Sequence, residues 1–253
     1  MIKNCPKLQG LTGNFPSLLK LEIRKCKVLA VLPSLPSLRN LEIDECEDML
    51  QVPFPDLKSV SYLCISNISK LICMPKGLLK SLQNLRELKI DNCNELMSLW
   101  LENGQITFTS LQCIEIWCSN KLVSLPNNIP TLESLKLMYC CNLESLPDCA
   151  HLTNLKDLEI NNIEKLVSFP KGLPLTLSRL VIKECQSLKN LPSGLHKLIC
   201  LELLEIRNCP RLEFLPDEGF PVSVKRISIF GCENLKCLPR EMRNLTSSLR
   251  AAN

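Results

Sequence analysis

The strongest constraint on the fold is a short pattern that recurs along nearly the whole chain. Its first complete copy reads Leu18-x-x-Leu21-x-Ile23-x-x-Cys26-x-x-Leu29-x-x-Leu32-Pro33. Ten full copies can be aligned, and they begin at Leu18, Leu38, Val60, Leu85, Leu111, Leu132, Leu155, Leu177, Leu201 and Val224. Their spacings run from 20 to 26 residues. A regular period of this length indicates one structural unit per copy, with each unit packed against its neighbours.

The spacing inside each copy predicts the conformation. Leu21 and Ile23 are two residues apart, so their side chains point to the same side of a short strand, and the residue between them points to the other side. The Leu-x-x-Leu-Pro half closes the coil, and proline favours extended or 3-10 turns over long helices. This pattern is typical of leucine-rich repeats. We therefore expect an α/β horseshoe, a leucine-rich repeat solenoid with a curved parallel β-sheet on the concave face and mostly irregular or 3-10 turns on the convex side.

The copies also predict the domain organisation. Residues 1–11 match the back half of an additional copy, and residues 245–249 resemble the front of a further one. We expect a single leucine-rich repeat domain over residues 1–253, with about eleven repeats and incomplete at both ends. The longest copies begin at Val60 and Leu85, and the second of these contains residues 99–105, in which Asn103-Gly104 signals a tight turn. We interpret this segment as a surface bulge.

Composition and charge exclude several classes of function. The chain has 17 prolines, 8 glycines and no Gly-Lys dipeptide, so it contains no phosphate-binding loop of the Walker type. Its net charge of +4 lies in residues 224–253, whereas a nucleic-acid-binding protein needs a basic stripe along one face. No uncharged run is long enough to span a bilayer, and the N-terminus has no apolar signal segment. We expect a cytoplasmic protein with no nucleic-acid or membrane partner.

Half of the 16 cysteines occupy one position of the repeat: Cys5, Cys26, Cys46, Cys93, Cys140, Cys185, Cys209 and Cys232. In other copies the same position holds Ile68, Ser119 or Ile163. A column that accepts these residue types favours a small, buried and weakly polar side chain, which a free thiol provides. We expect these cysteines to be packing groups, and in a cytoplasmic protein we do not expect them to form disulfides.

The remaining cysteines do not predict a metal or catalytic site. They form no Cys-x-x-Cys pair, and the nearest approach to a metal motif is Cys149-Ala-His151 beside Cys140-Cys141. A structural zinc site requires four suitably spaced ligands. A cysteine nucleophile would have to use His151 or His196, neither of which lies in a recognisable catalytic context. We therefore expect no metal, no cofactor, no small-molecule substrate and no enzymatic activity, and a cysteine enzyme remains the least favoured alternative.

Three phrases carry a resemblance to a known family: Leu21-Glu22-Ile23-Arg24-Lys25-Cys26, Leu41-Glu42-Ile43-Asp44-Glu45-Cys46 and Leu204-Glu205-Ile206-Arg207-Asn208-Cys209. They resemble the leucine-rich repeat region of plant intracellular nucleotide-binding disease-resistance proteins, especially the coiled-coil class. The resemblance implies a recognition module of an innate immune receptor. Its partner would be a pathogen effector, a guarded host protein or the receptor's own nucleotide-binding domain, which such a module helps to hold inactive. The alternative is a stand-alone leucine-rich repeat protein that binds and inhibits or scaffolds a host protein.

The side chains between the core positions of each strand predict where a partner binds. Most of them are charged or polar, but Trp117, Met138 and Tyr139 come from adjacent copies and are apolar. Aromatic residues and methionine are enriched at protein interfaces. We take these three residues as the first candidate contact patch. The alternative is that the nearby long loop covers them.

A second candidate patch lies toward the C-terminal end of the chain. It consists of Arg179, Lys183, Arg207, Arg226 and Phe230. A cluster of this kind suits an acidic protein partner. Three nearby acidic residues offer an alternative, because they could neutralise the cluster internally: Glu184, Glu202 and Glu205.

Overall fold

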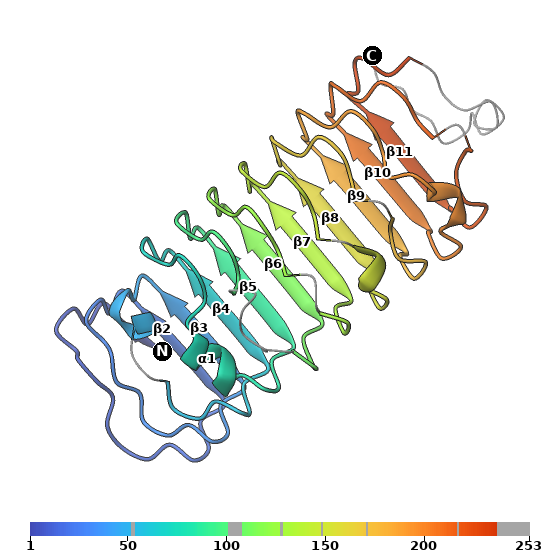
Figure 1. Cartoon of the computed structure of the whole chain (residues 1–253). Coiled ribbons are helices and arrows are strands. Elements are labelled where there is room, and N and C mark those ends of the chain that lie inside the picture. Colours follow the sequence, from blue (N-terminus) through green and yellow to red (C-terminus); the bar gives the residue numbers. More distant parts are fainter. Residues whose placement is uncertain are drawn as a thin grey trace. The chain divides into compact units, whose positions relative to one another are not determined.

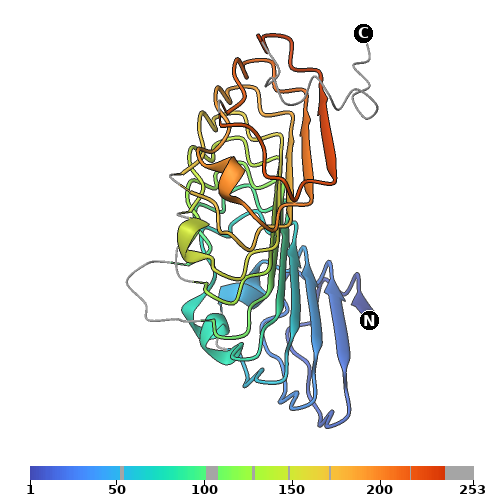
Figure 2. The ribbon, with the colours of Figure 1, turned by 90° about the vertical axis from the view of Figure 1, so that its right-hand side faces the viewer.

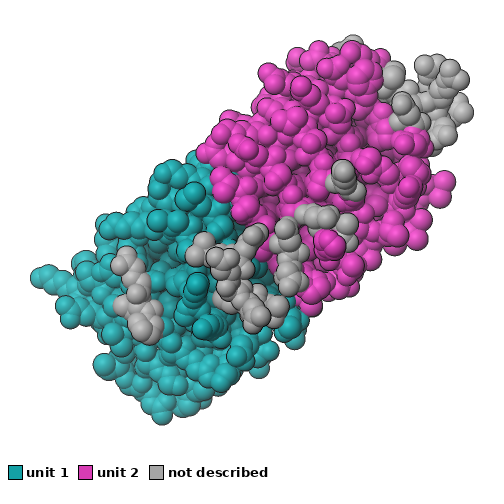
Figure 3. All heavy atoms as spheres, in the orientation of Figure 1, with its two compact units in different colours: residues 1–122 teal, residues 123–253 magenta. Residues whose placement is uncertain are grey.

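The computed structural model describes residues 1–51, 54–100, 108–126, 129–147, 149–170, 172–216 and 218–236. The chain forms two compact units, unit 1 over residues 1–122 and unit 2 over residues 123–253 (Figure 3). Each unit is a stack of coils with one β-strand per coil. The prediction of one domain over residues 1–253 stays a prediction.

Unit 1 contains a parallel sheet whose strands follow one another in chain order (Figure 1). Its strands are β1 (Ile2–Lys3), β2 (Lys20–Arg24), β3 (Asn40–Asp44), β4 (Tyr62–Ser66), β5 (Glu87–Asp91) and β6 (Cys113–Trp117). Its helical segments are the 3-10 helix Asp48–Gln51 and the α-helix α1 (Lys76–Ser81). The strand β1 shows that residues 1–11 include the end of a strand as well as the back half of a coil, because Ile2 pairs with Ile23.

Unit 2 repeats this architecture. Its strands are β7 (Ser134–Met138), β8 (Asp157–Asn161), β9 (Arg179–Lys183), β10 (Leu203–Arg207) and β11 (Arg226–Phe230). The helical segments among its described residues are the 3-10 helices Cys149–His151 and Leu195–Lys197. In each unit the strands form one side, and the short helices lie on the other (Figure 2). The predicted leucine-rich repeat solenoid, with a parallel sheet and mostly irregular or 3-10 turns opposite it, is confirmed in both units.

The core of each unit lies between the sheet and the turns. The Leu and Ile side chains at the second and fourth strand positions point inward, and Leu41, Ile43, Leu158 and Ile160 are fully buried. Burying an aliphatic side chain of this size contributes roughly 1.5–3 kcal/mol to the free energy of folding. Because the core positions alternate with outward ones, the same register that builds the core also fixes which side chains face solvent.

The long copies contain structure that the spacing alone did not predict. Twenty-five residues separate Val60 from Leu85, and the extra length forms α1, which buries Leu78 and Leu79. In the next copy the first two residues of the expected surface bulge, Leu99 and Trp100, are instead buried. The Trp100 ring packs on Phe108 with a centroid separation of 5.0 Å. This interpretation therefore was wrong at residues 99 and 100, and residues 101–107 lie outside the described residues.

A residue with a left-handed backbone follows each strand. These residues, which we call the left-handed row, are Asn4, Lys25, Glu45, Asn67, Asn92 and Cys118 in unit 1 and Tyr139, Asn162, Glu184, Asn208 and Gly231 in unit 2. The positive φ lets the backbone N–H donate to the last strand residue of the next coil, as Tyr139 N does to Asn161 O at 2.9 Å. Asn and Gly tolerate this conformation, whereas larger side chains are strained in it.

The cysteine column follows the left-handed row by one residue. Its members from Cys26 to Cys209 are fully buried, including Cys46, Cys93 and Cys140, whereas Cys5 and Cys232 in the terminal coils are partly exposed. Each thiol lies near the carbonyl oxygen two residues earlier, and Cys46 Sγ is 3.2 Å from Asp44 O. Burial raises the pKa of Cys46 to about 11 and that of Cys93 to about 12, so both stay protonated and unreactive at neutral pH.

Fifteen cysteines lie in the described part of the chain, and none of these fifteen forms a disulfide. Within the described ranges, no group of three or more His, Cys, Asp or Glu side chains is placed to hold a metal ion. The described helices are all too short or too polar to cross a membrane.

Candidate functional site

The outward face of each sheet consists of three rows of side chains, contributed by the first, third and fifth residues of each strand. Strand pairing keeps these rows in register: Glu22 lies opposite Glu42, and Asp44 lies opposite Ser66. The rows predicted from the repeat alignment are therefore present within each unit.

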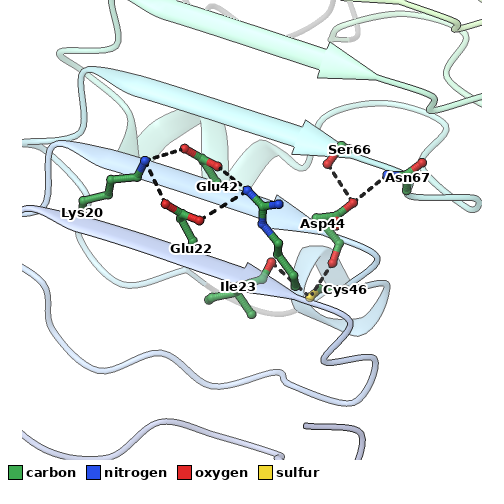
Figure 4. Close-up of polar contacts among 9 residues, drawn as sticks. Lys20, Glu22, Ile23, Glu42, Asp44, Cys46, Ser66 and Asn67 are labelled. Carbon is green, nitrogen blue, oxygen red and sulfur yellow. Dashed lines mark hydrogen bonds and ion pairs between the residues drawn. The ribbon is translucent and has the colours of Figure 1, made fainter. Parts of the chain in front are cut away.

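In unit 1 the outward charges nearest the N-terminus neutralise one another. Lys20 Nζ lies 2.9 Å from Glu22 Oε1 and 3.0 Å from Glu42 Oε1 (Figure 4). Arg24 Nη2 lies 3.3 Å from the other oxygen of each carboxylate. The hydrogen bond from Lys20 holds the pKa of Glu22 below its usual range. Two cations and two carboxylates thus form a closed quartet.

The polar groups beside this quartet also bind one another. Asp44 Oδ1 accepts hydrogen bonds from Ser66 Oγ at 2.9 Å and from Asn67 Nδ2 at 2.6 Å (Figure 4). Asn67 Oδ1 in turn accepts one from Asn92 Nδ2 at 2.6 Å. Counted over strands β2 to β6, the outward positions carry three basic and six acidic side chains. This face is net acidic, and much of its hydrogen-bonding capacity is used internally.

The face of unit 2 has the opposite balance, with five basic and three acidic side chains at the outward strand positions. Arg179 lies 2.6 Å from Asp157 and 2.9 Å from Glu159. Lys183 lies 3.6 Å from Glu159 and 3.2 Å from Glu205. Arg179, Lys183 and Arg207 thus share three carboxylates, and the positive excess of the face comes from Lys136 and Arg226.

Part of that excess is open to a partner. Arg207 binds Glu205 through Nε at 2.8 Å, and its side chain is 49% exposed. Among the described residues its two terminal nitrogens have no partner. Arg226 is exposed and makes no ion pair with any described residue. Phe230, which pairs with Arg207 across the two strands, is 44% exposed.

The residues of the second candidate patch all lie on the outward face of unit 2, and their role in binding stays a prediction. Glu205 neutralises part of this patch, as the alternative inferred from the sequence held, whereas Glu202 binds Lys225 at 2.8 Å. The other neutralising groups are Asp157 and Glu159, which sequence reasoning missed. Their place in the outward rows one strand before Arg179 was the available signal, because opposite charges on adjacent strands attract.

The members of the first candidate patch belong to different units. Trp117 ends β6 in unit 1 and is 39% exposed. Met138 ends β7 in unit 2, and Tyr139, which follows it, is 41% exposed. Large apolar side chains on a wet sheet face are typical of contact sites. That the three form one patch stays a prediction.

Asn161 is an additional polar member of the unit 2 face that the sequence did not single out. It lies between Met138 and Lys183 in the strand register. Its Oδ1 atom is buried and has no hydrogen-bond partner among the described residues. An unsatisfied buried acceptor lowers stability by about 1–3 kcal/mol, so this position is not optimised for folding.

Comparison with curated proteins identifies related sequences. The chain is 33% identical over 116 residues to the Arabidopsis thaliana protein SUPPRESSOR OF npr1-1, CONSTITUTIVE 1, a match that covers 44% of this chain and 8% of that protein. It is 34% identical over 108 residues to disease resistance protein RPS4B of the same plant, covering 42% and 9%. The chain is similar to the leucine-rich repeat region of plant disease-resistance proteins. The matched segments span less than a tenth of the length of these two relatives, and no family model matches the chain.

A solved structure supports the same fold. The leucine-rich repeat domain of the type III effector XCV3220 (XopL) superposes with a TM-score of 0.63 at 26% identity, covering 85% of this chain and 77% of that domain. The leucine-rich repeat fold and the disease-resistance relatives together support a protein-interaction module. The finer assignment to the coiled-coil class stays a prediction.

Proposed function

We propose that this chain is the protein-recognition module of a plant innate immune receptor, and that it binds a pathogen effector or a guarded host protein through the outward face of its sheets. The observation that carries the proposal is the exposure of Trp117 and Phe230 at strand ends and of Tyr139 just after one. Apart from Met138, the other residues that end the strands β2 to β10 are charged or polar. Exposed aromatic anchors contribute most of the binding energy of protein interfaces, and exposed charge pairs contribute little.

The proposed module works by binding alone. It acts in the cytoplasm with no cofactor and no catalytic step, and its second partner is the receptor's own nucleotide-binding domain. Contact with that domain contributes to autoinhibition. Partner binding would relieve it by favouring a receptor conformation in which this contact is absent. The basic face of unit 2 and the acidic face of unit 1 would give such contacts their charge specificity.

Site-specific crosslinking tests the proposal. A photoreactive phenylalanine analogue is placed singly at position 117, at position 139, and as a control at Ile199, which is 71% exposed and follows the 3-10 helix Leu195–Lys197 on the side opposite the strands. In plant tissue infected with a pathogen that triggers the immune response, positions 117 and 139 should crosslink to the same protein, and position 199 should not. Equal yields at all three positions would contradict a specific surface.

Purified partner then provides the quantitative measurement. Trp117→Ala with Tyr139→Ala should weaken its binding at least 100-fold and leave the melting temperature nearly unchanged, because both side chains are substantially exposed. The matched control, Glu133→Ala with Lys156→Ala, removes an exposed ion pair of 2.8 Å and should change neither. A large loss of stability in the aromatic double variant would mean that these rings are core residues.

The second candidate function is a stand-alone leucine-rich repeat protein that binds and inhibits or scaffolds a host protein. The similarity to the leucine-rich repeat domain of a type III effector favours this second candidate, because that repeat domain belongs to an effector and not to a disease-resistance protein. Sequencing of the transcript upstream of Met1 separates the two candidates. An upstream reading frame with a phosphate-binding loop would support the receptor, and an upstream stop codon would support the stand-alone protein.

A further inference from the structure

The fifth residues of the unit 2 strands form one continuous row, which we call the strand-end row. Its members in register are Met138, Asn161, Lys183, Arg207 and Phe230. Tyr139 adjoins Met138 and is 41% exposed. The row therefore has an apolar end at Met138 and Tyr139, two cations near its middle, and an aromatic end at Phe230.

We propose that the strand-end row binds an extended acidic peptide segment that carries one apolar side chain at each end. This inference rests on the proposed function and specifies the chemistry of the partner. The segment lies across the strands, with one apolar side chain on Tyr139 and Met138 and the other on Phe230, and with two carboxylates facing Lys183 and Arg207.

Charge complementarity selects an acidic occupant. The outward strand positions of unit 2 carry five basic against three acidic side chains. Glu205 is shared by Lys183 at 3.2 Å and Arg207 at 2.8 Å, and Lys183 also lies 3.6 Å from Glu159. Arg207 uses Nε for its contact with Glu205, and its terminal nitrogens have no partner among the described residues. A guanidinium edge of this kind binds a carboxylate through two hydrogen bonds.

The strand spacing sets the length of the segment. Neighbouring strands lie about 4.8 Å apart, so four intervals separate Met138 from Phe230 by roughly 19 Å. An extended chain advances about 3.3 Å per residue, and alternate side chains point to the same side. Six residue steps therefore match the row. The expected segment has apolar side chains at its first and seventh positions and acidic side chains at its third and fifth.

The backbone at Tyr139 provides a variant that removes the aromatic ring without weakening the fold. Tyr139 has φ 57°, which Asn adopts more readily than Tyr. Tyr139→Asn should therefore keep or raise stability, so a loss of binding by this variant reports on the lost ring. Glu184→Asn introduces Asn at another left-handed position of the same unit, where φ is 53°. It serves as the control.

Fluorescence anisotropy with a synthetic peptide tests the proposal on the full chain. The probe is acetyl-Leu-Ser-Asp-Ser-Asp-Ser-Phe-amide with an attached dye. Three comparison peptides replace both Asp by Asn, move the two Asp to the second and sixth positions, or replace Leu and Phe by Ser. The probe should bind at least ten times more tightly than each of them, and its affinity should fall as salt rises.

Substitutions in the protein test the proposed peptide site independently of the peptide sequence. Arg207→Gln and Tyr139→Asn should each weaken probe binding about tenfold, whereas Lys225→Gln and Glu184→Asn should leave it within twofold. Lys225 is a matched basic control, because it lies outside the strand-end row and pairs with Glu202. Absence of probe binding, or equal binding of the Asp and Asn peptides, would overturn the inference.

The two proposals fail in distinguishable ways. If crosslinking at Trp117 and Tyr139 identifies a specific partner that lacks any such acidic segment, the proposed function stands and the peptide inference is wrong. If the probe binds as expected but no partner crosslinks at those positions, the row is a peptide site and the proposed receptor function is wrong.

Discussion

Arg179 Nη2 donates a hydrogen bond to Glu159 Oε2 at 2.9 Å from the neighbouring strand. Glu159 is 9% exposed and is the one charged residue among the described residues that counts as buried. A buried carboxylate persists as an ion only when cations or hydrogen-bond donors compensate for its lost hydration. Arg179 and Lys183 supply that compensation, and this explains why the basic cluster contains an acidic centre.

Replacing Glu159 by Gln should lower the free energy of unfolding by about 1–2 kcal/mol. The cost should stay below that of a fully buried pair, because the Arg179 side chain is 34% exposed and keeps Asp157 as a partner. Urea denaturation provides the measurement. Glu133→Gln, which breaks an exposed pair with Lys156, should change stability by less than about 0.5 kcal/mol. Equal effects of the two substitutions would contradict the burial argument.

The cysteine column should tolerate small side chains and reject charge. Cys140 is fully buried, with Sγ 3.6 Å from Met138 O. Cys140→Ala should lower the free energy of unfolding by about 1–2 kcal/mol through lost packing. Cys140→Ser should be mild, because Ser119 occupies the same position and its Oγ donates to Trp117 O at 3.2 Å. Cys140→Asp should prevent folding or nearly so. If Cys140→Asp had the same melting temperature as the wild type, the column would not be buried.

Residues in the left-handed row should respond to substitution by backbone conformation rather than by side-chain contact. Glu184→Asn should stabilise the protein by about 0.5–1 kcal/mol, because Asn visits positive φ more readily than Glu. Gly231→Ala should destabilise it, since Gly231 has φ 66° and an added Cβ would meet Asn208. Thermal melts would measure both changes. If Glu184→Asn is neutral and Gly231→Ala stabilising, backbone strain does not control this row.

Stability should fall at alkaline pH because of the buried thiols. An ordinary cysteine has a pKa of 9.0, whereas the pKa of Cys46 is about 11 in the folded protein. Below pH 9 both states keep the thiol protonated. Above it the unfolded chain loses the proton first, so the free energy of unfolding decreases as pH rises from about 9 to about 11. Urea melts at pH 7, 9 and 10.5 would show the decrease.

Two further measurements check that prediction. Cys46→Ala with Cys93→Ala should show a smaller loss of stability between pH 7 and 10.5 than the wild type, since Ala does not titrate. Mass spectrometry after brief alkylation at pH 7.5 should find exposed Cys200 labelled and buried Cys46 and Cys93 unlabelled. An unchanged pH dependence in the double variant, or rapid labelling of Cys93, would show that burial does not govern these thiols.

The repeat made most of the fold predictable from sequence. A period of two inside Leu-x-Ile places alternate side chains on opposite faces, so the repeat alignment by itself predicts the outward rows that contain Glu22, Glu42, Lys183 and Arg207. The cysteine column followed in the same way, because one position that holds Cys, Ile or Ser in different copies must be small and enclosed. Side-chain periodicity is a local property, and a local property can be read from a linear chain.

Other features depend on contacts between coils and were decided by the tertiary structure. The sequence placed Trp100 in a surface bulge, but its ring is buried against Phe108. The prediction failed because neither periodicity nor turn signals show which side chains of a loop pack into the core. Tyr139 is a residue type that does not favour positive φ, although the same repeat position holds Asn or Gly in six other copies. Its conformation exists because its N–H must reach Asn161 O in the next coil.

The candidate site shows the same division. The sequence by itself determined that Arg179, Lys183, Arg207 and Phe230 share one face, because strand alternation allows no other arrangement. The tertiary structure decided which charged groups remain available to a partner. Asp157 and Glu159 form ion pairs with Arg179, whereas the terminal nitrogens of Arg207 have no partner among the described residues. Net charge on a surface is a sum over neighbours from several strands, and the distances in that sum exist only after the coils have stacked.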